Sequence, residues 1–416
     1  MKVVLLSHSD TRGGAAIVTR RLMDALRAEG VDARMVVFAK TSDSDNVSLA
    51  STAMRRRVAF LAERADIFAH NGFNRADLFK VSTARTGVPV DRHPWVREAD
   101  IVVLSWINQG LLSLDGIARI AALGKPVVWT MHDMWCMTGI CHHALDCTAY
   151  ERECGRCPFL GSRRPNDLSH KTWRLKRRLY DEAPITFVAV SRWLADLARR
   201  SSLLANRPIE VIPNAFPVDR YITRPTTSPA DLGLPADRDI ILFGAARLDD
   251  PIKGLDIAVD ALNHLHDDYP AVAAKATAVF FGDIRNPELF SRLRLDYRRL
   301  GPVYDPERLH QLYASAKVVL STSLRETLPT TLIEGQAAGC FPVTFGEGGQ
   351  RDIVTGPANG YIARYMDARD VAAGIAHGLT AIVDRDALHA DVERRFGRHA
   401  VATRYIFLFN NLLSNK

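Results

Sequence analysis

Residues 1–39, MKVVLLSHSDTRGGAAIVTRRLMDALRAEGVDARMVVFA, decide the fold class. Short apolar runs at residues 1–7 and 33–39 are typical of buried strands. Between them, residues 15–30 repeat apolar side chains every three to four positions and end at Gly30, as expected of an amphipathic helix. A strand, a helix and a second strand in this order predict a parallel sheet covered by helices.

The same alternation continues along the chain and is interrupted once, at residues 213–239, where proline, threonine, aspartate and glycine indicate a linker. The expected strands lie at 100–106, 125–132, 185–191 and 209–214 before the interruption, and at 239–246, 276–283, 317–323 and 340–345 after it. We therefore predict two Rossmann-like, doubly wound α/β domains, at residues 1–215 and 216–395. A final helix at about 396–416 is expected to pack back on the first domain.

The composition is typical of a globular protein that binds an anionic partner. It has 416 residues, of which 47% are hydrophobic and 24% charged, enough for a large core. No apolar run approaches the ~20 residues of a membrane-spanning helix, and we see no signal peptide, so we expect a cytoplasmic protein. The net charge of +7 indicates an anionic partner. Basic residues at 55–57 and 171–178 indicate either solvated helix faces or peripheral contact with an anionic inner-leaflet membrane.

The loops that follow the strands are where open α/β sheets bind ligands. After the first strand, Gly13 and Gly14 open a helix, where free N–H groups can face an anion; a tight turn explains the pair equally well. After the strand at 239–246, Arg247 and Lys253 flank an Asp-Pro turn. Two cations there suit a diphosphate, although a pair of surface salt bridges is the alternative.

A third loop, RETLPTTLIEG at residues 325–335, points to the same ligand. Pro329 favours a helix start, so Thr330 and Thr331 offer free N–H groups to a phosphate. Glu334 follows in a helix of small and apolar residues, and its carboxylate can accept two ribose hydroxyls. Glu326, nearer the tip of the loop, can accept hydroxyls of a sugar.

Two strand ends of the first domain carry polar and aromatic residues. His132 and Asp133 follow one strand, and Trp106 and Asn108 follow another. A histidine at a strand end is a candidate for catalysis, whereas tryptophan and asparagine suit the wall of a sugar site. A core tryptophan is an equally good explanation of Trp106.

Five of the six cysteines lie between residues 136 and 157. Four of them form a candidate structural zinc site: Cys141, Cys147, Cys154 and Cys157. Reduced thiols are the next interpretation and disulfides the last, because the expected compartment is reducing.

Arg247 with Lys253, followed by Glu326 and Glu334, resembles the donor site of family-four retaining glycosyltransferases of the GT-B fold. The stretch HDMWCMTGICHHALDCTAYERECGRCPFL, residues 132–160, is similar to the cysteine loop of colanic-acid and related exopolysaccharide enzymes. The resemblance implies two domains facing a central cleft, the first binding the acceptor and the second a nucleotide diphosphate sugar. It also implies transfer of a hexose with retention, without a catalytic metal.

Residue roles follow from the same resemblance. It assigns the diphosphate to Arg247 and Lys253, the ribose to Glu334, and the transferred sugar to Glu326 and His132; Gly13 and Gly14 line the cleft. The family's usual Glu-Gly-Phe-Gly is here Glu-Thr-Leu-Pro at 326–329, so the resemblance does not carry the glycine backbone contacts to sugar and phosphate over to this chain.

Two other functions remain as alternatives. A nucleotide-sugar epimerase can share the two-domain fold, because fold alone does not set function. A zinc-binding protein that contacts nucleic acid would explain the cysteines and the basic residues, but it leaves Glu326 and Glu334 without a role.

Overall fold

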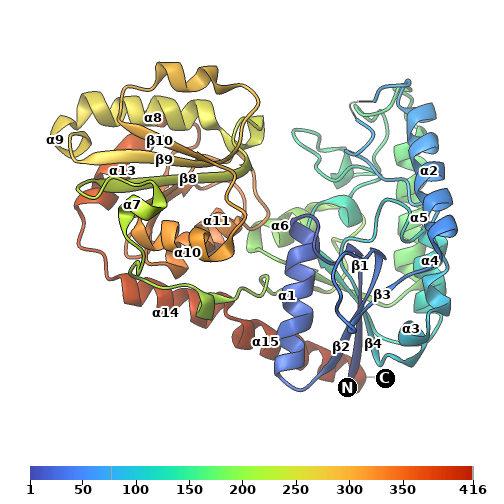
Figure 1. The fold of residues 1–416 in the computed structure, drawn as a ribbon. Coiled ribbons are helices and arrows are strands. Elements are labelled where there is room, and N and C mark those ends of the chain that lie inside the picture. The colour runs from blue at the N-terminus through green and yellow to red at the C-terminus, as the bar shows by residue number, and fades with distance from the viewer. Residues whose placement is uncertain (76, 415–416) are drawn as a thin grey trace. The chain divides into compact units, whose positions relative to one another are not determined.

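The computed structural model describes residues 1–75 and 77–414 (Figure 1). The chain forms two compact α/β units. The first comprises Met1–Phe216 together with the segment that begins at Arg398, and the second comprises Pro217–Gly397. Within the described residues, no helix is both long enough and apolar enough to cross a membrane.

The first unit is built on a seven-stranded sheet in the order β3-β2-β1-β4-β5-β6-β7. Every neighbouring pair is parallel. The strands are β1 (Lys2–Ser9), β2 (Asp32–Ala39), β3 (Val47–Leu49), β4 (Ile101–Leu104), β5 (Val127–Met131), β6 (Ile185–Ala189) and β7 (Ile209–Val211). Strands β4, β5 and β6 are buried along their whole length, as expected of a parallel sheet covered on both faces.

Helices cover both faces of this sheet (Figure 1). On one face α1 packs against α15, and their apolar side chains share a core with alternate residues of β1, such as Val3 and Leu5. The other face carries α2 to α5 (Figure 1). The helices are α1 (Gly14–Ala28), α2 (Ala53–His70), α3 (Pro94–Glu98), α4 (Leu114–Ala121), α5 (Leu168–Glu182), α6 (Arg192–Arg200) and α15 (Arg398–Ser414).

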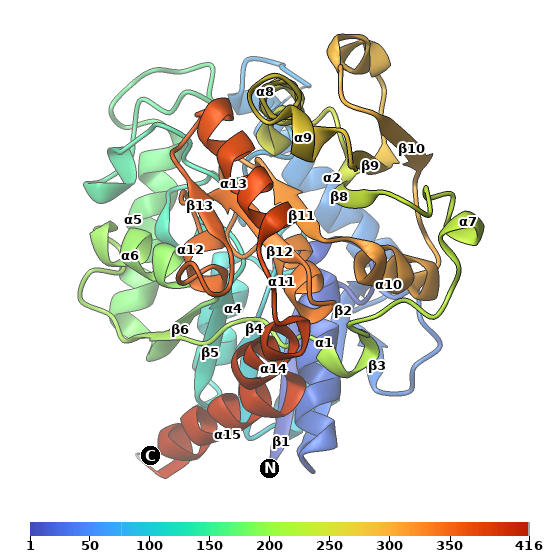
Figure 2. The ribbon, with the colours of Figure 1, turned by 90° about the vertical axis from the view of Figure 1, so that its left-hand side faces the viewer.

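The second unit has a six-stranded parallel sheet in the order β10-β9-β8-β11-β12-β13. The strands are β8 (Asp239–Arg247), β9 (Ala276–Asp283), β10 (Tyr297–Gly301), β11 (Val318–Ser321), β12 (Phe341–Phe345) and β13 (Tyr361–Ala363). The helices α8 and α13 pack together on one side of the sheet, and α10, α11 and α14 lie on the other (Figure 2). The helices are α7 (Pro229–Leu232), α8 (Leu255–Asp268), α9 (Pro270–Ala273), α10 (Pro306–Ser315), α11 (Thr330–Ala337), α12 (Gln350–Ile353), α13 (Ala368–Thr380) and α14 (Arg385–Phe396).

The prediction of two doubly wound, Rossmann-like α/β domains is confirmed. The strands that the sequence pattern missed are β3, β10 and β13, which lie at sheet edges. Each has five residues or fewer and is partly exposed, and β10 carries two arginines, so none shows the apolar run of a central strand.

The strand orders place one topological switch point in each unit. In the first sheet, β2 and β3 lie beyond β1 on one side, and β5, β6 and β7 lie beyond β4 on the other. In the second sheet, β9 and β10 lie beyond β8, and β12 and β13 lie beyond β11. The crevice beyond the carboxyl ends of two such strands is where doubly wound sheets bind ligands. We therefore expect ligand sites in the loops after β1, β4 and β5 and in those after β8 and β11.

Candidate functional site

His132 follows β5 directly and contacts the loop after β4. Its Nε2 lies 2.6 Å from the hydroxyl of Ser105, which in turn lies 2.5 Å from the hydroxyl of Thr19 on α1. Burial disfavours the charged ring and lowers the pKa of His132 to about 4, against the attraction of the neighbouring Asp133. His132 is therefore neutral at neutral pH.

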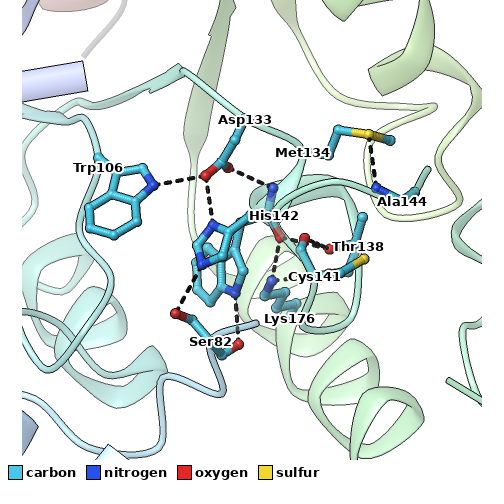
Figure 3. Close-up of polar contacts among 10 residues, drawn as sticks. Ser82, Trp106, Asp133, Met134, Thr138, Cys141, His142, Ala144 and Lys176 are labelled. Carbon is cyan, nitrogen blue, oxygen red and sulfur yellow. Dashed lines mark hydrogen bonds and ion pairs between the residues drawn. The ribbon is translucent and has the colours of Figure 1, made fainter. Parts of the chain in front are cut away.

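Asp133 holds the surrounding side chains in place (Figure 3). Its Oδ1 accepts the backbone N–H of Trp135 at 2.8 Å. Its Oδ2 accepts the indole N–H of Trp106 at 2.8 Å and lies 2.6 Å from Nδ1 of His142. Burial raises the pKa of Asp133, but the charge and hydrogen bond of His142, the N–H of Trp135 and the charge of His143 together outweigh it and lower the pKa to about 2. Both oxygens of this anion are engaged within the protein.

The ring of Trp106 packs against two histidine side chains, His8 and His142, at the carboxyl edge of the first sheet. Its ring meets His8 edge-on, with 5.6 Å between ring centroids, and lies 5.4 Å from the ring of His142. Asn108 is 3% exposed, and its backbone carbonyl lies 3.2 Å from Nδ1 of His8. Its side-chain nitrogen is buried with no hydrogen-bond partner among the described residues. The structure thus brings Trp106 and Asp133 together, and adds His8 and His142, which the sequence pattern did not single out.

The four cysteines proposed as zinc ligands line one small cavity of about 20 Å³ and form no disulfide. Burial raises the pKa of Cys154 to about 11 and that of Cys157 to about 12. The backbone N–H of Gly139 donates to Sγ of Cys154 at 3.2 Å. Over residues 1–75 and 77–414, however, no group of three or more histidine, cysteine or acidic side chains is placed so that it could hold a metal ion.

Lys176 departs from the surface location expected of the basic stretch 171–178. Its side chain is fully buried beneath the cysteine loop (Figure 3). The ammonium donates to the carbonyls of Trp135 at 2.5 Å and Thr138 at 3.0 Å, and it lies 3.4 Å from the centre of the Trp135 ring. Burial lowers its pKa to about 7. Lys176 therefore fastens this loop to α5.

In the second unit, hydrogen bonds join the loop after β8 to the loop after β11. The ammonium of Lys253 lies 2.5 Å from Oε1 of Glu326. The hydroxyl of Thr322 donates to the carbonyl of Gly254 at 2.8 Å, and the N–H of Leu324 donates to the carbonyl of Ile252 at 2.8 Å. Two residues that the sequence placed in separate loops, Lys253 and Glu326, thus form one ion pair at the switch point.

Arg247 ends β8, and its partners among the described residues are two long ion pairs. Its guanidinium lies 3.5 Å from Asp249 and 3.6 Å from Asp250, and its side chain is 38% exposed. Ion pairs of this length and exposure are weak, so the guanidinium can exchange them for a stronger anion.

Glu334 lies on α11 and has a partner that sequence reasoning missed. The hydroxyl of Tyr313, on α10, donates to its Oε2 at 2.8 Å. Burial and the charge of Glu334 raise the pKa of Tyr313 well above its ordinary value, so the hydroxyl stays protonated and remains a donor. Helix α11 begins at Thr330, with Thr331 next, and no side chain caps it. The first N–H groups of this helix are therefore free of a side-chain cap.

Gly13 and Gly14 differ in whether their surroundings and backbone conformation require glycine. Gly13 precedes α1 with a φ of 92°, a conformation that favours glycine. A Cβ atom added at Gly14 would meet no atom within 4 Å, and φ there is not in the left-handed region. The turn explains Gly13, whereas no contact with the described residues requires glycine at Gly14.

Two protein-family models match parts of this chain. The family model described as Glycosyltransferase Family 4 matches residues 12–220, half of the chain. The model described as Glycosyl transferases group 1 matches residues 238–381, within the second unit.

Curated relatives match over part of their length. The putative colanic acid biosynthesis glycosyl transferase WcaC of Escherichia coli is 31% identical over 153 residues, which are 35% of this chain and 35% of that protein. The D-inositol 3-phosphate glycosyltransferase of Xylanimonas cellulosilytica is 30% identical over 208 residues, 45% of this chain and 48% of that protein. The matched segments span only about a third to a half of these relatives.

Solved structures match over nearly the whole chain. Anabaena HepE, determined with UDP and glucose, has a TM-score of 0.61 at 17% identity and covers 99% of both chains. A glycosyltransferase from Rickettsia africae has a TM-score of 0.66 at 16% identity and covers 100% of this chain and 99% of that one. At these identities the likeness establishes the fold, which is the GT-B type.

Proposed function

Since the chain belongs to glycosyltransferase family 4, we propose that it moves a hexose from a nucleotide diphosphate sugar to a saccharide or lipid-linked saccharide, with retention at the anomeric carbon. One observation carries this proposal. The end of β8 at Arg247, the Lys253–Glu326 pair and the start of α11 all belong to the β8/β11 switch point, where the fold binds nucleotides. Structures of relatives with UDP and with UDP-glucose support the class of donor.

In this proposal the second unit binds the donor. Arg247 and Lys253 neutralise the diphosphate, and the free N–H groups of Thr330 and Thr331 contact a phosphate oxygen. Glu334 accepts ribose hydroxyls, with its carboxylate oriented by Tyr313. Glu326 serves two partners: it accepts hydroxyls of the sugar and holds Lys253 in place.

The chemical step then depends mainly on the leaving group. Negative charge grows on the departing diphosphate as the bond to the sugar breaks, and fixed cations stabilise that charge. The acceptor hydroxyl attacks from the side that the diphosphate leaves, and a phosphate oxygen takes its proton. His132 contributes as a neutral hydrogen-bonding group for a sugar hydroxyl, and Trp106 and Asn108 contribute to the acceptor side.

The proposal is tested by melting the purified protein with UDP, GDP, ADP or dTDP. One of these nucleotides should raise the melting temperature, and Glu334→Ala should abolish the rise. Glu288→Ala, which changes an exposed glutamate of the same unit, is the matched control and should keep it. An unchanged melting temperature with all four nucleotides would contradict the proposal. Donor sugars incubated without acceptor separate a transferase, which leaves the sugar unchanged or hydrolyses it, from an epimerase, which converts it.

We also propose peripheral contact with an anionic membrane through α2. Met54, Val58 and Leu61 lie three or four residues apart on this helix and are more than half exposed. Arg55 and Arg57 beside them are exposed as well. An exposed apolar stripe with flanking arginines suits the surface of an anionic bilayer, where a lipid-linked acceptor resides. Vesicles with phosphatidylglycerol should sediment the protein, and Arg55→Glu with Arg57→Glu should prevent it; equal binding to neutral vesicles would contradict the proposal.

A structural zinc ion in the cysteine loop is the third part of the proposal. The four thiols line one cavity, but among the described residues they are not placed as a metal-holding group, so coordination of an ion requires them to rearrange. Metal analysis of protein purified without chelator should find one zinc per chain, and the zinc should be lost in Cys154→Ser with Cys157→Ser. Cys340→Ser, at the buried cysteine of the second unit, is the control. Substantially less than one zinc in the unchanged protein would contradict the assignment.

A further inference from the structure

Three hydrogen bonds in the first unit form a continuous line that ends at His132. The hydroxyl of Thr19 lies 2.6 Å from the carbonyl oxygen of Ala15, one turn earlier on α1. The same hydroxyl lies 2.5 Å from that of Ser105, and Ser105 lies 2.6 Å from Nε2 of His132. The side chains of Thr19 and Ser105 are almost completely buried, so water does not supply alternative partners.

Counting protons along this line fixes the direction of every bond. A carbonyl oxygen cannot donate, so the single hydroxyl proton of Thr19 must point to Ala15. Thr19 can then only accept from Ser105, which uses the one proton that Ser105 has. No proton is left between Ser105 and His132 unless the ring supplies it. Nε2 of His132 must therefore carry the proton and donate to Ser105.

We infer that Thr19 and Ser105 are positioning residues that hold His132 as the Nε2–H tautomer, leaving Nδ1 as an acceptor for a substrate hydroxyl. The inference rests on the proposed function, in which His132 meets a sugar. Nδ1 has no hydrogen-bond partner among the described residues and is not among their buried unpaired atoms, so it is open to a ligand. The line thus determines which partner His132 selects: a hydroxyl that donates a hydrogen bond.

The chemical state of the ring supports this role. Because burial keeps His132 neutral at neutral pH, the ring does not gain a second proton that would cover Nδ1. A substrate with a fluorine or an O-methyl group in place of the hydroxyl cannot donate to Nδ1 and should lose this contact. We expect the reaction rate of such analogues to be lower by a factor of about ten or more, because a buried hydrogen-bonding group is then left without its partner.

The sharpest test replaces Thr19 by valine, which has the same shape but cannot accept a hydrogen bond. Ser105 then loses its acceptor, and its proton can turn to Nε2 of His132, which drives the ring proton to Nδ1. Nitrogen-15 NMR of histidine-labelled protein reports the tautomer directly, with the His132 signal assigned from His132→Gln. We expect Nε2–H in the unchanged protein and in Thr19→Ser, and Nδ1–H in Thr19→Val.

Kinetics supply the second readout. Thr19→Val should lower kcat/KM about 10- to 100-fold, because an inverted ring offers a donor where the substrate needs an acceptor, and Thr19→Ser should restore the rate. Ser105→Ala, which mixes the tautomers, is the second variant if Thr19→Val does not fold. An Nδ1–H ring in the unchanged protein, or an unaltered tautomer in Thr19→Val, would overturn the inference. Nucleotide binding through Glu334 is measured separately, so failure of the donor proposal remains distinguishable.

Discussion

The β1/β4 switch point of the first unit and the β8/β11 switch point of the second occupy equivalent places in two sheets of one kind, yet their chemistry differs. In the first, a line of neutral groups orients His132, and the carboxylate of Asp133 is engaged within the protein. In the second, charged groups predominate, and Arg247 is held by ion pairs of 3.5 and 3.6 Å. The fold sets where ligands bind, whereas the side chains set what the two places do.

The largest effect should come from removing a cation of the second unit. Lys253→Ala removes charge that stabilises the departing diphosphate, and we expect kcat/KM to fall about 10²- to 10³-fold. The free energy of unfolding should change little, because the Lys253–Glu326 pair is partly exposed. Steady-state kinetics and denaturant unfolding of the same preparation measure the two quantities.

The control for Lys253 lies at the other end of the same two strands. Lys317, before β11, pairs with Asp239 of β8 at 2.8 Å, on the amino-terminal edge of the sheet. Lys317→Ala removes an equivalent ion pair and should leave kcat/KM unchanged. Equal losses in the two variants would mean that the carboxyl edge is not the site.

The next largest effect should fall on stability and in the first unit. Asp133→Asn removes the anion that holds Trp106 and His142, and we expect a loss of about 3 kcal/mol in the free energy of unfolding. Nucleotide binding by the second unit should persist. Asp196→Asn, which alters an exposed pair with Arg199, is the control and should cost less than about 1 kcal/mol.

The same carboxylate makes a prediction about pH. Its pKa is about 2 in the folded protein and 3.8 ordinarily, so the unfolded chain takes up the proton first as pH falls. The stabilisation, about 2 kcal/mol, is therefore complete above pH 4 and lost between about pH 4 and pH 2. Denaturant midpoints measured over this range should fall more steeply for the unchanged protein than for Asp133→Asn; parallel curves would contradict the assignment.

The smallest effect should come from Tyr313→Phe. It removes one hydrogen bond to Glu334, and we expect the Kd of the bound nucleoside diphosphate to rise about 5- to 10-fold. Tyr361→Phe removes a bond of the same length, 2.8 Å, to Asp370 in the same unit and should leave the Kd unchanged. Calorimetric titration measures both, and a similar rise in both variants would show that the effect is not specific to Glu334.

The sequence predicted the central strands and the loops that carry the candidate site, because apolar runs and strand ends are local patterns. It did not predict that Lys253 contacts Glu326, since the two are 73 residues apart and only the sheet order brings their loops together. Tyr313 was missed for the same reason: nothing in its helix indicates a contact with Glu334. Ser105 directly follows β4, but its small side chain shows no role in the sequence, because only the fold brings Thr19 and His132 to it.

Lys176 shows how a charge pattern misleads. Counting basic residues at 171–178 treats all of them alike, whereas the helical repeat turns one of them inward under the cysteine loop. The carbonyls that hold its ammonium come from residues about 40 positions earlier, so only the structure reveals them.

Helix α15 has a consequence for the order in which the chain folds during synthesis. Val401, Ala402, Tyr405 and Phe409 complete a core that otherwise consists of residues from the first unit, and Tyr405 meets Thr130 across 275 positions of sequence. The ribosome makes the whole second unit before these side chains emerge. The half translated first is thus the last to be completed, and the part of its core that α15 covers beside α1 stays exposed for that interval. Closing contacts so distant in sequence is slow, so newly made chains should need protection from aggregation at that face until α15 arrives.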